Sequence, residues 1–167
     1  MTMDDTMNPA PFGLAPGEGE ALWFLGSLQT IKAGATSTGG RFSVLEAHAV
    51  EGPASPLHVH HNESEWWYVL EGELAIWAAG AVIEAPTGSF VYGPVGVPHT
   101  FSVVSAQARF LLGTEPAGFE AFIRACAEPA QKLTLPPPGT AVADPARVAA
   151  VAAEYGIEIL GPPGFPD

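Results

Sequence analysis

The sequence has one cysteine, Cys126, and few basic residues. A single cysteine permits no disulfide within the chain, and its apolar neighbours predict a small residue on a helix face rather than a reactive thiol. Only 6 Lys and Arg stand against 18 Asp and Glu, which gives a formal net charge of −12. Because such a chain repels phosphate backbones and anionic bilayers, we expect neither nucleic acid nor a membrane surface as a partner.

Long hydrophobic runs are also missing. The uncharged apolar run from 75 to 83 is far shorter than the roughly 20 residues of a membrane span. Asp4 and Asp5 stand where a secretory signal would carry Lys or Arg, and no apolar segment follows them. We therefore expect a cytoplasmic protein.

The composition favours one all-β domain. The 167 residues are 47% hydrophobic, enough for a core without a disulfide, and the 19 glycines and 17 prolines favour many short strands joined by turns. A tight hairpin turn is predicted at Glu71-Gly72. Strands are expected in eight segments, at about 21–33, 41–50, 56–60, 65–70, 73–79, 89–94, 99–104 and 108–113. This pattern predicts a β-sandwich or a small barrel.

The chain after Gly113 is predicted to turn helical. One amphipathic helix would bury the stripe Phe119, Phe122, Ile123 and Cys126. A second would begin at Asp144-Pro145 and end at Gly156, burying Val148, Val151, Ala152 and Tyr155. We therefore expect a loose leader over 1–20, a barrel over 21–113, and a helical, proline-rich extension over 114–167 that packs on the barrel or on a neighbouring subunit.

Three of the five histidines lie between positions 58 and 61, beside two glutamates. Alternate residues of a strand share a face, so His58 and His60 can converge on one ion while His61 points away. On the next strand, Glu65 shares a face with Trp67 and could reach the same ion if that strand pairs with the histidine strand.

Other residues near the cluster have competing interpretations. Glu63 is a rival ligand to Glu65 but falls in the turn between the strands. His61 is expected to be exposed. Glu46 and His48 share a face of the preceding strand and could lie behind the ligands, although a surface pair is the more ordinary interpretation. A fourth ligand candidate, His99, opens a strand after a turn rich in proline and glycine.

These positions resemble the two sequence motifs of the cupin family. The first, G-x5-H-x-H-x4-E-x6-G, and the second, G-x5-P-x-G-x2-H, match in residue type and spacing over a resemblance covering about 40–112. The matching positions are Gly52, His58, His60, Glu65, Gly72, Gly88, Pro94, Gly96 and His99. The second motif usually ends in Asn, where this chain has Val103, which puts some local hydrogen bonding in doubt.

The resemblance implies a cupin jelly-roll β-barrel with short C-terminal helices and one divalent metal ion (Fe, Mn, Ni, Co, Cu or Zn). The implied ligands are His58, His60, Glu65 and His99. The stretch from Pro56 to Glu73 is similar to that of quercetin 2,3-dioxygenase-like cupins, which implies a metal-dependent dioxygenase acting with O2 on a phenolic or enolisable small molecule.

In that interpretation Glu65 is also the catalytic proton acceptor. Trp67 and Phe101 are expected to line the substrate pocket, because they share faces with ligands. The alternatives are another metal-dependent cupin enzyme, such as an isomerase, and a non-catalytic module that binds a small ligand. A homodimer is expected, because cupins commonly pair through exposed strands.

Overall fold

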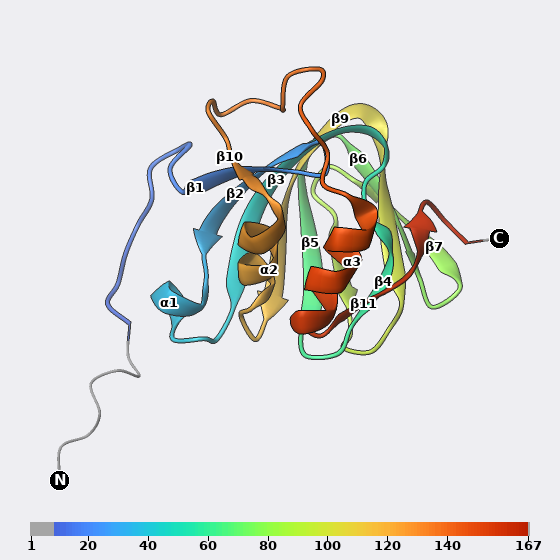
Figure 1. The fold of residues 1–167 in the computed structure, drawn as a ribbon, viewed down its shortest axis with the longest axis horizontal. Coiled ribbons are helices and arrows are strands. Elements are labelled where there is room, and N and C mark those ends of the chain that lie inside the picture. The colour runs from blue at the N-terminus through green and yellow to red at the C-terminus, as the bar shows by residue number, and fades with distance from the viewer. Residues whose placement is uncertain (1–8, 167) are drawn as a thin grey trace, which may run out of the picture.

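A computed structural model describes residues 9–166 of the chain. The strands are β1 (Glu20–Phe24), β2 (Ser27–Ala33), β3 (Ser43–Pro53), β4 (Pro56–His60), β5 (Ser64–Glu71), β6 (Glu73–Ala78), β7 (Ala81–Pro86), β8 (Phe90–Gly93), β9 (His99–Glu115), β10 (Glu128–Pro129) and β11 (Ile157–Pro163). The helices are α1 (Ala35–Thr38), α2 (Phe119–Cys126) and α3 (Pro145–Glu154). The all-β jelly-roll with short C-terminal helices is thus confirmed (Figure 1).

Strand β9 organises the barrel. It pairs with β3 along most of its length, with β5 and β6 on its other edge, and with β4 through His58 opposite His99. The two predicted strands at 99–104 and 108–113 are therefore parts of one continuous strand. All eleven strands join one hydrogen-bonded sheet, which curls around the interior.

The predicted hairpin at Glu71-Gly72 is wrong. Strands β5 and β6 do not pair with each other; they run one after the other along β9, bent at Gly72. A side chain at Gly72 would collide with the Gln107 carbonyl of β9, so glycine is needed there for close strand approach. The hairpin lies at Ala79-Gly80, between β6 and β7, and β7 was not predicted.

A second tight turn divides the predicted strand at 21–33. Leu25 and Gly26 connect β1 to β2, with φ of 46° and 80°. Both φ values are positive, as a two-residue turn between twisted antiparallel strands requires. The resulting hairpin places the exposed Gly26 at one end of the barrel.

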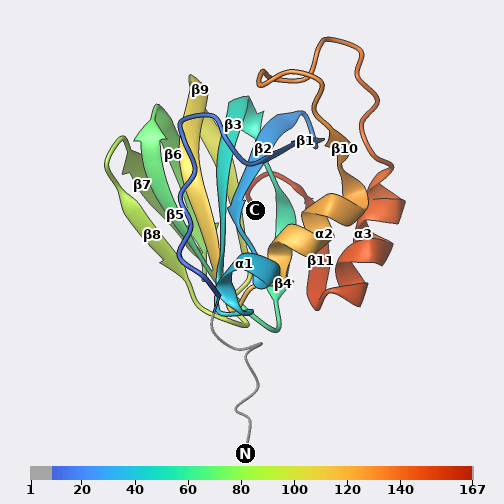
Figure 2. The ribbon, with the colours of Figure 1, turned by 90° about the vertical axis from the view of Figure 1, so that its left-hand side faces the viewer.

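The C-terminal segment covers one side of the barrel. Figure 2 shows α2 and α3 side by side, across the molecule from β7 and β8. Asp144 caps α3 by accepting a hydrogen bond from the Ala146 amide, with Pro145 in the first turn, as predicted. The unpredicted β11 then pairs with β4, the strand that carries His58 and His60.

The core is continuous from the barrel into this segment. Inward-facing residues of β3, β5 and β9 pack with α2 and α3, so the extension packs on its own barrel. The expected helix stripes face this core; their buried members are Phe119, Phe122, Ile123, Val148 and Ala152, with Cys126, Val151 and Tyr155 partly buried against it. No helix among residues 9–166 is long and apolar enough to span a membrane.

Of the leader expected over 1–20, residues 1–8 lie outside the described part of the chain. Residues 9–19 contain neither helix nor strand, and Glu20 already belongs to β1.

Candidate metal centre

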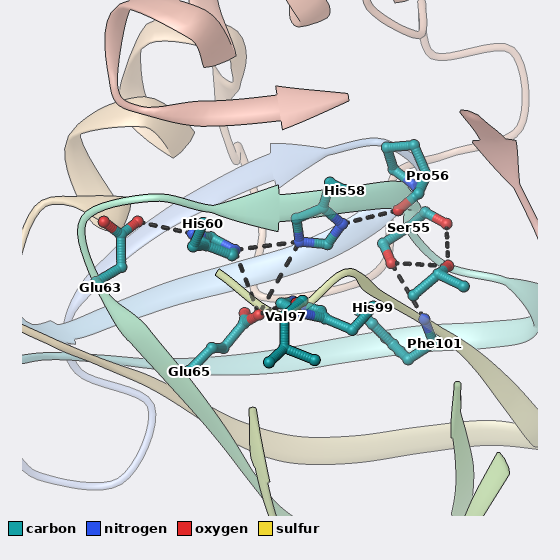
Figure 3. A network of polar contacts seen from close by, with 10 residues as sticks. Ser55, Pro56, His58, His60, Glu63, Glu65, Val97, His99 and Phe101 are labelled. Atoms are coloured by element: carbon teal, nitrogen blue, oxygen red, sulfur yellow. Dashed lines mark hydrogen bonds and ion pairs between the residues drawn. The ribbon is translucent and has the colours of Figure 1, made fainter. Parts of the chain in front are cut away.

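Four predicted ligands meet inside the barrel. His58 and His60 come from β4, Glu65 from the start of β5, and His99 from the first residue of β9. All four are buried, and one ligand atom of each lies within 4.8 Å of the others (Figure 3). Strand β5 does not pair with β4, which was the condition set for Glu65 to reach the ion. Glu65 still lies beside the histidines, because both strands pair with β9 and the sheet curls.

The spacing of the ligand atoms suits a shared ion. Glu65 Oε2 lies 2.8 Å from His99 Nε2, 3.4 Å from His60 Nε2 and 4.0 Å from His58 Nε2. The Nε2 atoms of His58 and His60 are 3.1 Å apart. Ligands bound at about 2.1 Å from one ion lie roughly 3 to 4 Å from each other, so little movement is needed.

Each imidazole is oriented by a hydrogen bond at its other nitrogen. Nδ1 of His58 donates to the Pro56 carbonyl at 2.8 Å, and Nδ1 of His99 donates to the Val97 carbonyl at 2.9 Å. Nδ1 of His60 donates to the Glu63 carboxylate at 2.7 Å. Because these acceptors fix the proton on Nδ1, all three Nε2 atoms face the common centre (Figure 3).

The electrostatics of the ligands are strongly coupled. Burial lowers the pKa of His58 to about 3, assisted by repulsion from His99. Burial opposes protonation of His60 too, but the Glu65 and Glu63 carboxylates outweigh it and raise the pKa of His60 to about 9. Burial would raise the pKa of Glu65, yet His60 and His99 hold it well below its usual range.

These residues fit a divalent metal ion. His60 is protonated between the Glu63 and Glu65 carboxylates, so it places a positive charge where a bound ion would place its own. The donor set of three imidazoles and one carboxylate suits the transition metals from manganese to zinc. The described residues can therefore hold one ion at this centre.

A cavity of about 150 Å³ extends from the ligands, and its wall includes His58 and Glu65. Most of the wall is apolar, including Phe101, Phe110 and Phe119, with Val148 and Ile157 from the C-terminal segment. The lining residues Gly26, Glu51 and Pro53 are exposed, so the mouth lies between the β1–β2 turn and the end of β3. The centre thus adjoins a largely apolar pocket.

Not all predicted site residues reach this pocket. Phe101 lines it, whereas Trp67 is fully buried, is absent from the wall and packs edge-on against His99 at 5.4 Å between ring centroids. His61 is exposed, as expected, and pairs with Glu158 at 2.9 Å.

Glu46 and His48 lie on the outer surface, which was the more ordinary of the two interpretations, and not behind the ligands. Glu46 pairs with Lys32 and Arg109, and His48 contacts Gln107 on the outer surface. Both side chains lie on the face of β3 opposite Leu45 and Ala47, which face the core. The carboxylate that supports a ligand is instead Glu63, which the sequence presented only as a rival ligand.

Residues 45–112 match the family model of the cupin domain. The chain is 29% identical over 119 residues to quercetin 2,3-dioxygenase of Bacillus subtilis (strain 168), covering 71% of this chain. It spans only 35% of the length of that relative.

Several solved structures share the fold. KdgF from Halomonas sp. is 14% identical, with a TM-score of 0.52 over 57% of this chain and 85% of that one. The nucleoside dehydratase Pac13, from Streptomyces, is 14% identical, with a TM-score of 0.54 over 65% of this chain and 84% of that one. At these identities the likeness concerns the fold alone. The fold, the motif residues and the family match agree: residues 45–112 form a cupin domain, and the chain is similar in sequence to a quercetin 2,3-dioxygenase.

Proposed function

We propose that the protein is a metal-dependent dioxygenase that oxidises a phenolic or enolisable small molecule with O2. The observation that carries the proposal is the three-histidine, one-glutamate cluster on the wall of an apolar cavity, in a chain similar to a quercetin 2,3-dioxygenase. His58, His60, Glu65 and His99 would hold the ion. The Glu65 carboxylate would neutralise one charge of a divalent ion, so the centre would keep about one positive charge. The ion would then supply affinity for a deprotonated oxygen and for O2.

The chain's own groups would bind and orient the substrate. The apolar wall excludes water and strengthens electrostatic interactions at the ligands. Cavities of about 150 Å³ hold molecules of benzene size, so the pocket favours a single-ring compound over a three-ring flavonol.

Glu65 would accept the substrate's hydroxyl proton. Of the described residues that line the cavity, only Glu65 and Glu51 carry a carboxyl group, and Glu51 is exposed at the mouth. His60 and His99 keep the pKa of Glu65 low, so the carboxylate becomes a stronger base when either contact loosens.

Oxygen uptake tests this proposal. The protein is reconstituted separately with Fe(II), Mn(II), Ni(II) and Co(II), and dioxygen is followed with catechols, single-ring hydroxyketones and quercetin. We expect uptake with single-ring compounds in at least one form, and its loss in Glu65→Gln but not in the mouth variant Glu51→Gln. No uptake in any metal form would contradict the dioxygenase.

The same assay separates the other candidate functions. They need a test because a shared fold does not fix the reaction, and one solved structure with this fold is a dehydratase. Turnover under anaerobic conditions would indicate an isomerase or another non-oxidative enzyme. Thermal stabilisation by a ligand without turnover would indicate a binding module.

We further propose that the protein forms a homodimer. Trp66 and Tyr68 on β5 lie opposite Tyr92 and Phe90 on β8, on the outer face of the sheet, and Phe90 is 62% exposed. Within the described residues β8 pairs only with β5, so its other edge is open. Sedimentation should show a dimer that Phe90→Ser with Tyr92→Ser converts to monomers; a monomeric wild-type protein would contradict this.

A further inference from the structure

A row of three phenylalanine rings extends along the cavity from the metal centre toward the mouth. The Phe119 ring lies edge-on to the ligand His60, with 5.4 Å between the ring centroids. The Phe122 ring is 5.7 Å from that of Phe119, and the Phe24 ring is 5.7 Å from that of Phe122. All three phenylalanines line the cavity, and Phe24 directly precedes the β1–β2 turn at the mouth.

This phenylalanine row lies outside the segment that matches the cupin domain. Phe24 ends β1, and the other two rings belong to α2, whereas the match covers 45–112. The matched segment adds Phe101 and Phe110 to the cavity wall, with 5.5 Å between their ring centroids. Segments on both sides of the cupin domain therefore give the cavity an aromatic wall, to which the proposed function assigns no role.

Phe119 is held in place beside the ligand. It begins α2, and the buried carboxylate of the next residue, Glu120, accepts hydrogen bonds from the Gly118 amide at 2.9 Å and from the Ala35 amide at 2.6 Å. These bonds tie the first turn of α2 to the start of α1. Phe119 lines the cavity and is 8% exposed, so a ligand in the cavity can contact its ring.

Aromatic rings attract one another by more than burial. A benzene ring is negative on its faces and positive at its edge, so two rings about 4.5 to 7 Å apart attract in edge-to-face or offset arrangements. A saturated ring of the same size is more apolar but lacks this distribution of charge. Burial alone therefore favours the saturated ring, whereas contact with phenylalanine favours the aromatic one.

We propose that Phe119 binds an aromatic ring of the substrate beside the metal centre, and that the phenylalanine row selects aromatic over aliphatic compounds. The inference rests on the proposed function and narrows its substrates from phenolic or enolisable compounds to phenolic ones. A substrate oxygen held at the centre would bring the attached ring to the Phe119 end of the row, because Phe119 contacts the ligand His60.

Two hydroxamates with rings of equal size test the inference. Benzohydroxamate and cyclohexanecarbohydroxamate bind a metal ion through the same two oxygens and differ in whether the six-membered ring is aromatic. Calorimetry on the nickel-loaded protein gives both dissociation constants without turnover. The aromatic preference is the dissociation constant of the cyclohexane compound divided by that of the benzene compound. We expect this preference to be roughly three- to tenfold larger in the wild-type protein than in Phe119→Leu.

The comparison between variants cancels any difference in how the two compounds themselves bind nickel. Phe42→Leu is the matched control, because it makes the same change at a ring that is 42% exposed and does not line the cavity. This control should keep the wild-type preference. Phe119→Met, which nearly preserves the side-chain volume, is used if Phe119→Leu does not fold. If Phe119 only packed the core, its replacement would weaken both compounds equally.

The outcomes separate the inference from the proposed function. Equal aromatic preferences in the wild-type protein and the Phe119 variant overturn the inference, and oxygen uptake would still support the dioxygenase. The inference also fails if neither hydroxamate binds the nickel-loaded protein. A preference that falls in the Phe119 variant supports the aromatic-ring site, even if no metal form takes up oxygen and the dioxygenase is rejected.

Discussion

Glu63 accepts a hydrogen bond from Nδ1 of His60 at 2.7 Å, although it lies in the turn between β4 and β5. Its side chain is buried at 5% exposure. The contact fixes the His60 ring and leaves Nε2 for the shared centre. A carboxylate behind a metal-binding histidine also makes the imidazole a stronger donor to the ion.

Replacing this carboxylate should weaken metal binding. We expect Glu63→Gln to lower the affinity for zinc or cobalt by about 10- to 100-fold, measured by competition with a chromophoric chelator. Glu158→Gln is the matched control, because Glu158 makes a similar contact with the exposed His61. Equal affinities in the two variants would show that Glu63 does not support the site.

Metal binding should release a proton from His60. The pKa of His60 is raised to about 9, so its imidazole is protonated at pH 7 and must lose that proton to bind an ion. Glu65 is ionised, and the pKa of His58, lowered to about 3, leaves that ring neutral. Affinity should therefore rise with pH and level off near pH 9.

Calorimetry in buffers of different ionisation enthalpy measures this release. We expect about one proton from His60 per ion at pH 7. A metal affinity that is constant between pH 6 and 8 would contradict this protonation state.

Two adjacent histidines allow a matched comparison. His60 faces the centre and is 1% exposed, whereas His61 faces solvent. We expect His60→Gln to lose most of the bound metal, and His61→Gln to retain the wild-type content, by elemental analysis. Equal metal content in the two variants would mean that the ion lies elsewhere.

The C-terminal segment should stabilise the barrel. Ile157 is 2% exposed, begins β11 opposite His60, and lines the cavity. We expect Ile157→Ala to lower the free energy of unfolding by about 2 to 5 kcal/mol in denaturant titrations. The exposed Ile83→Ala should cost less than about 1 kcal/mol. Similar losses in both variants would argue that β11 is not part of the cooperative core.

The local part of the site could be predicted from the sequence. The two-residue period of a strand alone puts His58 and His60 on one face, and motif spacing identifies Glu65 and His99. The sequence could not predict how Glu65 comes to lie beside the three histidines, because this depends on β9 lying between β4 and β5 in the curled sheet. That arrangement is a property of strand pairing over long sequence distances.

The errors have physical causes. Leu25-Gly26 and Ala79-Gly80 are hairpin turns whose first residue has positive φ without being Asn, Asp or Gly, so the usual signal was absent. Gly72 gave that signal but serves a close strand approach. Glu63 was ranked below Glu65 because it falls in a turn, and its supporting role was missed. The turn is held against the α3–β11 junction by hydrogen bonds from the His61 amide to the Gly156 carbonyl and from Asn62 to the Tyr155 carbonyl.

The most direct test is anomalous diffraction from crystals of the freshly purified protein, recorded at the absorption edge of its bound metal. We expect one strong peak within about 2.3 Å of His58, His60 and His99 Nε2 and of a Glu65 carboxylate oxygen. A centre without a peak in metal-loaded crystals, or a peak bound to other residues, would contradict it.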